Sequence, residues 1–177
     1  MAMRTLLGSW LLAAGAWTPV LLAGEPPTFY VATGGDNGGD GSMANPWATI
    51  SHAITQVPDG ALILVRPGTY TGQVRLEGIF TNGVTVRSEV PFQARLRHDR
   101  TTVICYEGIG IALEGFDIAH QPPVSGALVI QVQDLIGGPG GAQATSRIVI
   151  RNNLIHDSYD NDLLKINFAR NKVCSKS

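Results

Sequence analysis

The sequence predicts an all-β chain that folds as a right-handed parallel β-helix with an N-terminal capping α-helix. Two observations carry this prediction: short apolar runs alternate with glycine and asparagine over most of the chain, and two of these runs superpose residue by residue. Short strands joined by bends are typical of a solenoid, in which each turn of the coil, or rung, buries its apolar residues against the next. A β-sandwich is the alternative. The corner spacing and the lack of clear two-residue hairpin turns favour the β-helix.

The repeat is visible in "IALEGFDIAH" and "IVIRNNLIHD". Each stretch shows strand alternation, a three-residue corner and a second short strand. The matching pairs are Ile111 with Ile148, Leu113 with Ile150, Phe116 with Asn153, and Ile118 with Ile155. Asn153 suits a corner because asparagine tolerates left-handed backbone and its amide can bond to a neighbouring rung.

The segment before the repeats predicts a strand, a loop, a helix and a second strand. "TFYVA" is a short β-run, and "TGGDNGGDGSMAN" is rich in turn formers. Asn45 is the expected N-cap, Pro46 the first helical residue, and Gln56 the approximate end. "ALILVRPGTY" is a β-run closed by a Pro-Gly turn. The helix has an apolar face, which we expect to cover the open end of the coil; this face consists of Trp47, Ile50, Ala53, Ile54 and Val57.

Residues 1–23 predict an export signal. Arg4 supplies the positive charge, an apolar stretch follows, and cleavage after Ala23 is plausible. A transmembrane anchor is the alternative, but the stretch is short and interrupted by glycine and proline. We therefore expect a secreted or periplasmic protein with one β-helix domain over residues 24–177, and no membrane contact after cleavage.

Composition narrows the class of protein. The chain has 177 residues, a net charge of −1, 15% charged and 44% hydrophobic residues, which fits one globular domain. No basic field points to a nucleic acid, and we expect a monomer. Cys105 and Cys174 can pair in an oxidising compartment. The alternative is a buried thiol at Cys105.

The stretch "IHDSYDNDLLKIN" carries the candidate site. Its carboxylate and amide oxygens are the ligands that calcium prefers; the candidate metal ligands are Asp157, Asp160, Asn161 and Asp162. Lys165 follows as a candidate catalytic base. If Leu164 and Ile166 point into the core, Lys165 faces solvent.

This pairing suits removal of a proton beside a carboxylate, which is barely acidic until a cation neutralises that carboxylate. A lysine or arginine then accepts the proton. The alternative is a solvated turn, because Asp and Asn favour turns and nearby carboxylates stabilise the charged lysine.

Other polar groups favour structural roles. "GGDNGGDG" loosely matches a calcium loop but has no acidic residue in register downstream. His52 and His156 are expected at the surface, on the helix and in a turn respectively. Six arginines on β-runs favour solubility, or anionic-sugar binding if several share a face; they are Arg66, Arg75, Arg87, Arg95, Arg97 and Arg100.

The segment "YVATGGDNGGDGSMANPWATISHAITQVPDGALILVRPGTYTG" resembles the N-terminal part of secreted right-handed β-helix proteins of the pectate-lyase-like superfamily. The resemblance implies an exported carbohydrate-active protein that acts on an anionic polysaccharide, most often a polysaccharide lyase. It also implies that the Asp cluster and Lys165 act as a calcium site and base. The alternatives are a non-catalytic carbohydrate-binding or surface module, and a glycoside hydrolase or epimerase on this fold. The end of the chain lacks a capping pattern, so we expect an incomplete member of the group.

Overall fold

The computed structural model describes residues 24–124, 126–134, 145–167 and 174–176. In these ranges fourteen strands form three sheets, in which every strand pairing is parallel, and there is one short helix. Sheet A has the order β1 (Thr28–Val31), β2 (Leu62–Val65), β5 (Ile79–Ser88), β8 (Ile109–Glu114), β11 (Val149–Arg151) and β14 (Cys174–Lys176). Sheet B has the order β12 (Leu154–His156), β9 (Asp117–His120), β6 (Ala94–His98) and β3 (Gly68–Thr71). Sheet C has the order β13 (Leu164–Asn167), β10 (Ile130–Gln133), β7 (Val103–Tyr106) and β4 (Val74–Arg75).

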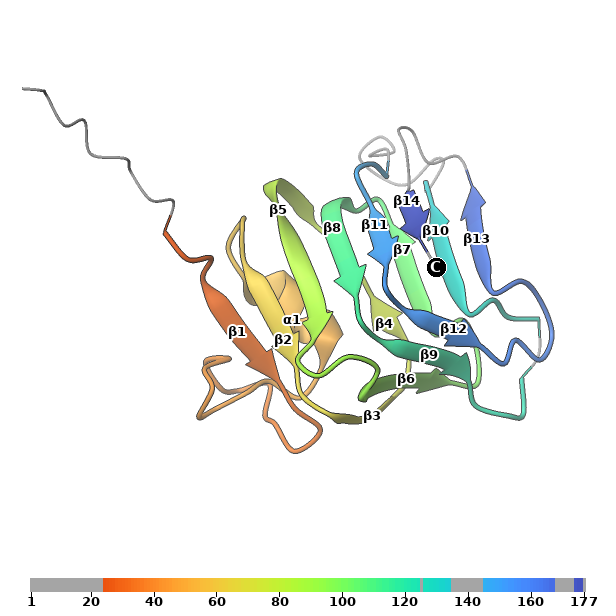
Figure 1. The fold of residues 1–177 in the computed structure, drawn as a ribbon, viewed down its shortest axis with the longest axis horizontal. Coiled ribbons are helices and arrows are strands. Elements are labelled where there is room, and N and C mark those ends of the chain that lie inside the picture. Colours follow the sequence, from red (N-terminus) through yellow and green to blue (C-terminus); the bar gives the residue numbers. More distant parts are fainter. Residues whose placement is uncertain (1–23, 125, 135–144, 168–173, 177) are drawn as a thin grey trace, which may run out of the picture.

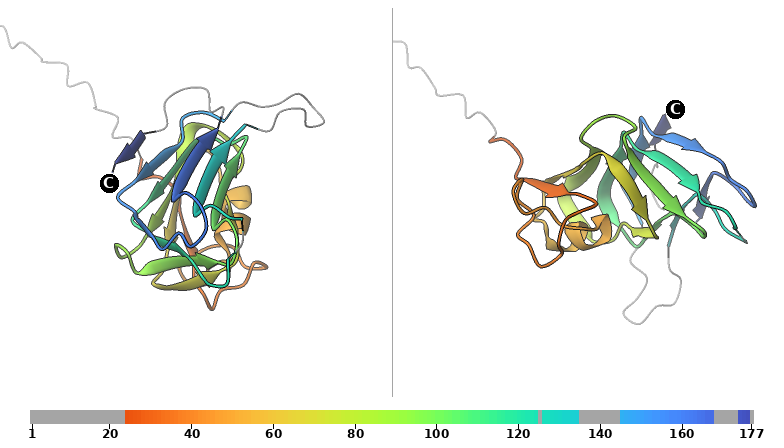
Figure 2. Two further views of the ribbon diagram at one scale, coloured as in Figure 1. Left: turned by 90° about the vertical axis from the view of Figure 1, so that its right-hand side faces the viewer. Right: turned by 90° about the horizontal axis from the view of Figure 1, so that it is seen from below.

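The chain passes from sheet A to sheet B to sheet C and returns to sheet A one rung further along (Figure 1). Two other views show the three sheets as the sides of one coil (Figure 2). This arrangement confirms the predicted parallel β-helix and excludes the sandwich, since antiparallel hairpins build a sandwich.

The register confirms the superposition of the two repeats. Ile150 pairs with Leu113, and Ile155 pairs with Ile118, one rung apart. Asn153 accepts a hydrogen bond from the backbone N–H of Phe116 (2.8 Å) and donates to the carbonyl of Leu113 (2.9 Å). The left-handed residue at this corner is Asn152, with φ 54°, so the two roles expected of Asn153 are divided between neighbouring asparagines.

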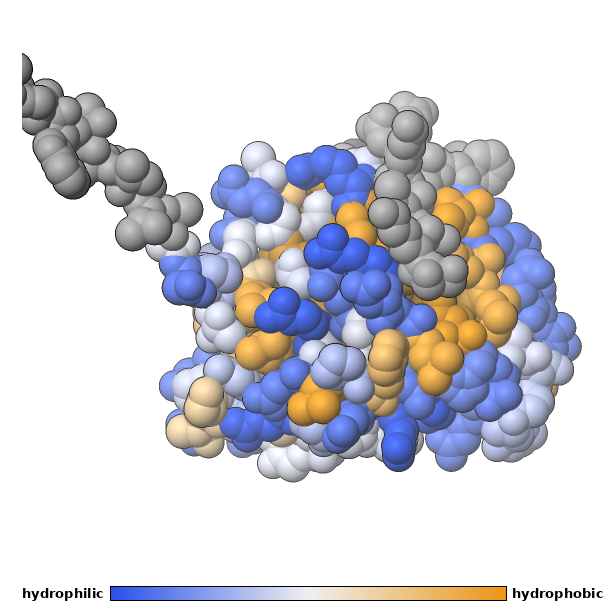
Figure 3. All heavy atoms as spheres, viewed as in Figure 1, coloured by the Kyte–Doolittle hydropathy of each residue, from blue (hydrophilic) through white to orange (hydrophobic). Residues whose placement is uncertain are grey.

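The core is a stack of inward-facing apolar side chains. In sheet A these include Ile63, Val86, Leu113 and Ile150, which are in register and buried. Burial of such columns is the main stabilising term of the fold. Figure 3 shows hydrophobic surface gathered toward the end of the coil where β12 and β13 lie.

The helix α1 (Ile50–Gln56) begins later than predicted. Its N-cap is Thr49, whose side chain accepts from the backbone N–H of His52. Asn45 is not the N-cap, because the segment after it is held extended. Trp47 bridges to Val31, and the side-chain oxygen of Asn37 accepts the N–H groups of Ala48 and Thr49.

The predicted capping role of the helix is confirmed. Ile50, Ala53 and Ile54 are buried in the core cluster, and α1 contacts β1, β2 and β4 at the first rung. A helix over the end of a solenoid shields strand edges that would otherwise pair with other chains.

Cys105 is a free thiol buried in β7, and burial raises its pKa to about 12. This matches the buried-thiol alternative for that residue. The expected export signal lies outside the described residues. Among the helices described, none has the length and apolar character to cross a membrane.

Candidate functional site

The sequence-predicted site residues lie where sheet B passes into sheet C. The connection 157–163 joins β12 to β13 and carries the four predicted metal ligands, and Lys165 is the second residue of β13. This places the lysine on sheet C and the Asp and Asn residues at its edge.

Lys165 lies exposed on the outer face of sheet C, as the alternation predicts. It is in register with Gln131, and that column continues through Ile104 to Arg75 on the first rung. Leu164 packs against the core, but Ile166 is 42% exposed, so its predicted inward position is only partly realised. β13 is the last strand of sheet C among the described residues, so no further rung covers it there.

A polar network beside Lys165 was missed at the sequence level. The Tyr106 hydroxyl donates to Gln131 Oε1 (2.8 Å), and Gln131 Nε2 donates to Gln133 Oε1 (2.7 Å). Burial raises the pKa of Tyr106, with a smaller opposing effect from Arg75, so its hydroxyl stays protonated at neutral pH. The sequence does contain a signal for this network, because Tyr106 follows the inward pair Val103 and Cys105 in "VICY" and the two glutamines alternate with inward Ile130 and Val132 in "IQVQ". Hydrogen-bonded amides on the face of a sheet are suited to binding sugar hydroxyls, because each amide both donates and accepts.

A pocket of about 660 Å³ lies at the connections between sheet B and sheet C. Asp99, Arg100 and Thr101 line it from the connection before β7, and Gly126 lines it from the connection before β10. The backbone N–H of Gly126 donates to the Asp160 carboxylate, which brings the predicted Asp-rich loop to the rim of this pocket.

The four predicted metal ligands do not converge. Asp157 has a left-handed φ of 49°, and its carboxylate lies 2.9 Å from His156 Nδ1. Asp160 binds the Gly126 N–H, and the Asn161 side chain accepts from the Asp162 backbone N–H (2.9 Å). In the described ranges no group of three or more His, Cys, Asp or Glu is placed to hold a metal ion. The side chains as arranged do not form one calcium site, and calcium binding stays a prediction.

His156 belongs to a charged network on the outer face of sheet B. Its Nε2 lies 2.8 Å from Asp117 Oδ1, which also accepts from Arg97 Nη2 at 2.7 Å. The sequence placed His156 in a turn or on the surface; it lies on β12 with both ring nitrogens against carboxylates. Burial raises the pKa of Asp117, but hydrogen bonds and charges from Arg97 and His156 outweigh burial and hold the pKa below its ordinary value.

Replacing Asp117 with asparagine is expected to destabilise the protein at neutral pH and to matter less in acid. A carboxylate with a lowered folded-state pKa stabilises the fold above its unfolded-state pKa, and this stabilisation is lost as the pH falls through the folded-state pKa. The Tm difference between wild type and Asp117→Asn should therefore shrink below about pH 4. Thermal melts from pH 7 to pH 2.5 test this, and a difference that is constant with pH would contradict it.

The Gly/Asp loop is structural, as expected. Asp36 accepts from the backbone N–H of Gly38, Asp40 accepts from that of Ser42, and Asn37 holds the segment before α1.

His52 lies edge-on to Trp47, with ring centroids 5.7 Å apart.

The six arginines do not share one face. Arg95 and Arg97 lie on sheet B, Arg75 on sheet C and Arg87 on sheet A. Arg66 donates to the carbonyl of Met43 from the corner after β2.

Comparison with known proteins adds information on the fold. No protein-family model matches the chain, and no curated protein sequence matches it. Among solved structures, the chain is similar to a rhamnogalacturonan lyase, with a TM-score of 0.50 and 16% identity over 72% of this chain. It spans 36% of the length of that lyase. The likeness is one of fold: stacked parallel strands like those of a polysaccharide lyase.

Proposed function

We propose that this protein engages an anionic polysaccharide on the outer face of sheet C, as a polysaccharide lyase or as part of one. The observation that supports this most is the placement of Lys165. Its side chain is exposed beside the hydrogen-bonded amides of Gln131 and Gln133. The fold that carries it is similar to that of a polysaccharide lyase. Residues 1–23 combine a positive charge with an apolar stretch, which supports export. Polymers of this kind are found outside the cytoplasm.

In the proposed reaction, Lys165 in its uncharged form takes the proton from the carbon beside a sugar carboxylate. The electron pair forms a carbon–carbon double bond, the glycosidic carbon–oxygen bond breaks, and the leaving oxygen takes a proton from water. Arg100 lines the pocket at the connections between sheets B and C, and we assign to it the positive charge that attracts the carboxylates of the polymer. A bound sugar chain would desolvate the amine, which favours its uncharged form. No step is assigned to calcium.

Lys165→Ala is expected to abolish product formation. The measurement is the ultraviolet absorbance of unsaturated uronates, on pectate, alginate and glycosaminoglycans, with calcium and with chelator. Arg95→Ala is the matched control, because Arg95 is an exposed cation on sheet B. Its side chain is 59% exposed. Activity that is equal with calcium and chelator would contradict a calcium role for Asp157, Asp160, Asn161 and Asp162.

A non-catalytic polysaccharide-binding module is the second candidate. The observation that favours it is that, in the described ranges, no three His, Cys, Asp or Glu side chains lie together as metal ligands. Retention on immobilised pectate without any rise in absorbance, from folded protein, would support this candidate and reject the lyase.

A further inference from the structure

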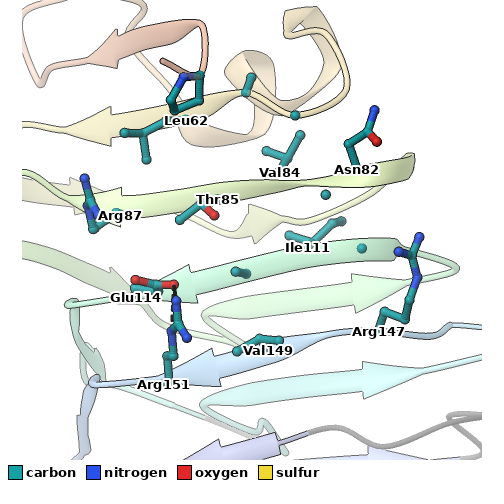
Figure 4. A pocket seen from close by; sticks show the side chains of 16 residues that line it. Leu62, Asn82, Val84, Thr85, Arg87, Ile111, Glu114, Arg147, Val149 and Arg151 are labelled. Atoms are coloured by element: carbon teal, nitrogen blue, oxygen red, sulfur yellow. Dashed lines mark hydrogen bonds and ion pairs between the residues drawn. The ribbon is translucent and has the colours of Figure 1, made fainter. Parts of the chain in front are cut away.

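The outer face of sheet A carries a groove of about 430 Å³. Uncharged side chains form its floor, one from each of four successive rungs in register: Leu62, Thr85, Ala112 and Val149. Figure 4 shows Arg87, Glu114 and Arg151 along one wall, and Asn82 and Arg147 along the other. Arg151 lies four positions after Arg147, so the walls stand at most about 13 Å apart.

One wall follows a column of glycines that ends in an arginine. Gly60, Gly83 and Gly110 each precede a floor residue by two positions and have φ values of +86°, +88° and +71°. The fourth member of the column is Arg147, with φ 53°. A left-handed conformation is unfavourable for a residue with a Cβ, so glycine is the natural occupant here and arginine is the exception. Strained backbone of this kind points to a role for the side chain.

The Arg147 side chain is held at the lip of the groove. Nη2 donates to the carbonyl of Phe80 (2.7 Å) and Nη1 to that of Thr81 (3.0 Å), so the side chain reaches back over the rung of Gly110 to β5. A guanidinium has five N–H donors, and the residue is exposed, so donors and charge stay free for a ligand.

The opposite wall is also positive. Glu114 is buried, and its carboxylate accepts from Arg151 Nε (2.7 Å), which offsets one of the two arginines there. The Arg87 side chain is exposed and has no hydrogen-bond or ion-pair partner among the described residues. The groove therefore has cations on both walls and a single carboxylate that is already paired.

We propose that this groove is a second anionic-saccharide site, which holds a uronate-bearing oligosaccharide that runs across the strands. Sheet A strands are already paired on both sides at the floor, so an added β-strand has no free backbone edge to bind there. Successive rungs are about 4.8 Å apart, close to the length of one sugar residue in an extended chain. Carboxylates along such a ligand meet Arg87 and Arg147 on opposite sides, and its sugar faces lie on the uncharged floor residues.

The groove and the site proposed on sheet C share only the class of ligand. The groove lies on a different sheet, and Lys165 has no part in it. Binding here would raise the local concentration of polymer at the sheet C face by tethering the same chain twice.

Calorimetric titration with a short oligogalacturonate tests the site, with a neutral oligosaccharide of equal length as the ligand control. Arg87→Ala and Arg147→Gly are each expected to weaken binding at this site about tenfold, as loss of a charge-assisted hydrogen bond does. Arg147→Gly suits the purpose because glycine occupies the same column in the three preceding rungs. Arg87→Ala removes a side chain without partners in the described chain, so the test does not depend on one variant folding. Arg95→Ala should bind like wild type.

Each outcome decides the matter. Weaker binding in both groove variants, with Lys165→Ala retaining the groove affinity, supports the second site. Unchanged affinity in both groove variants overturns it, as does wild-type protein that binds no oligogalacturonate. Loss of lyase product in Lys165→Ala with groove binding intact concerns the sheet C face alone, and an inactive protein that still binds through Arg87 and Arg147 rejects the lyase while keeping the groove.

Discussion

Truncating Phe116 to alanine is expected to lower the free energy of unfolding by about 3–5 kcal/mol. Phe116 is fully buried at the corner between β8 and β9. Its backbone is bound to the next rung on both sides, since its N–H donates to Asn153 and its carbonyl accepts from Leu154. The corner therefore cannot collapse to fill the cavity, and the cost should lie near the upper end of that range.

Urea unfolding of wild type and Phe116→Ala measures this effect. Phe92→Ala is the control, because Phe92 lies at the preceding A–B corner and is 45% exposed. We expect a loss below about 1 kcal/mol for the control. Equal losses in the two variants would mean that burial at the corner does not set the cost.

Gly110→Ala is expected to destabilise the fold by more than about 3 kcal/mol, or to prevent folding. Gly110 has φ +71°, and a Cβ there would lie 2.2 Å from the carbonyl oxygen of Phe80. A backbone atom in a paired strand cannot move aside as a flexible side chain can. The clash therefore adds to the unfavourable left-handed conformation.

Gly72→Ala separates the two contributions. Gly72 has φ +106°, but a Cβ there would have nothing within 4 Å. Thermal and urea unfolding of both variants should show that Gly72→Ala loses about 1–2 kcal/mol from conformation alone, and Gly110→Ala clearly more. The prediction for Gly110 fails if the two losses are the same.

The strand register was predictable because apolar alternation reports directly on which side chains face inward. The pairs Leu113 with Ile150 and Ile118 with Ile155 followed from that alternation alone. The start of α1 was not predictable by the same means. Asn45 and Thr49 are both good N-caps in isolation, and the choice between them depends on Asn37, which holds the intervening segment from a loop eleven or more residues away.

The candidate site was likewise predictable only in part. The outward position of Lys165 follows from strand alternation, whereas the directions of Asp157 and Asp160 depend on His156 and on the Gly126 backbone. Residue type showed which side chains suit calcium but not where a connection would turn them. The column of Gly60, Gly83, Gly110 and Arg147 could have been found from sequence, since each precedes a matched apolar run by one residue.

The connections between sheets B and C differ in length from rung to rung: 72–73, 99–102, 121–129 and 157–163. The A–B corners are 66–67, 89–93, 115–116 and 152–153. The paired strands of sheets B and C keep a continuous register despite the different lengths of the connections between them. Residues can thus be inserted or removed at the B–C corners without shifting any core column. The fold is in this sense modular: the wall of a surface beside sheet C can diversify in length and chemistry during evolution while the stacked scaffold that supports it is inherited unchanged.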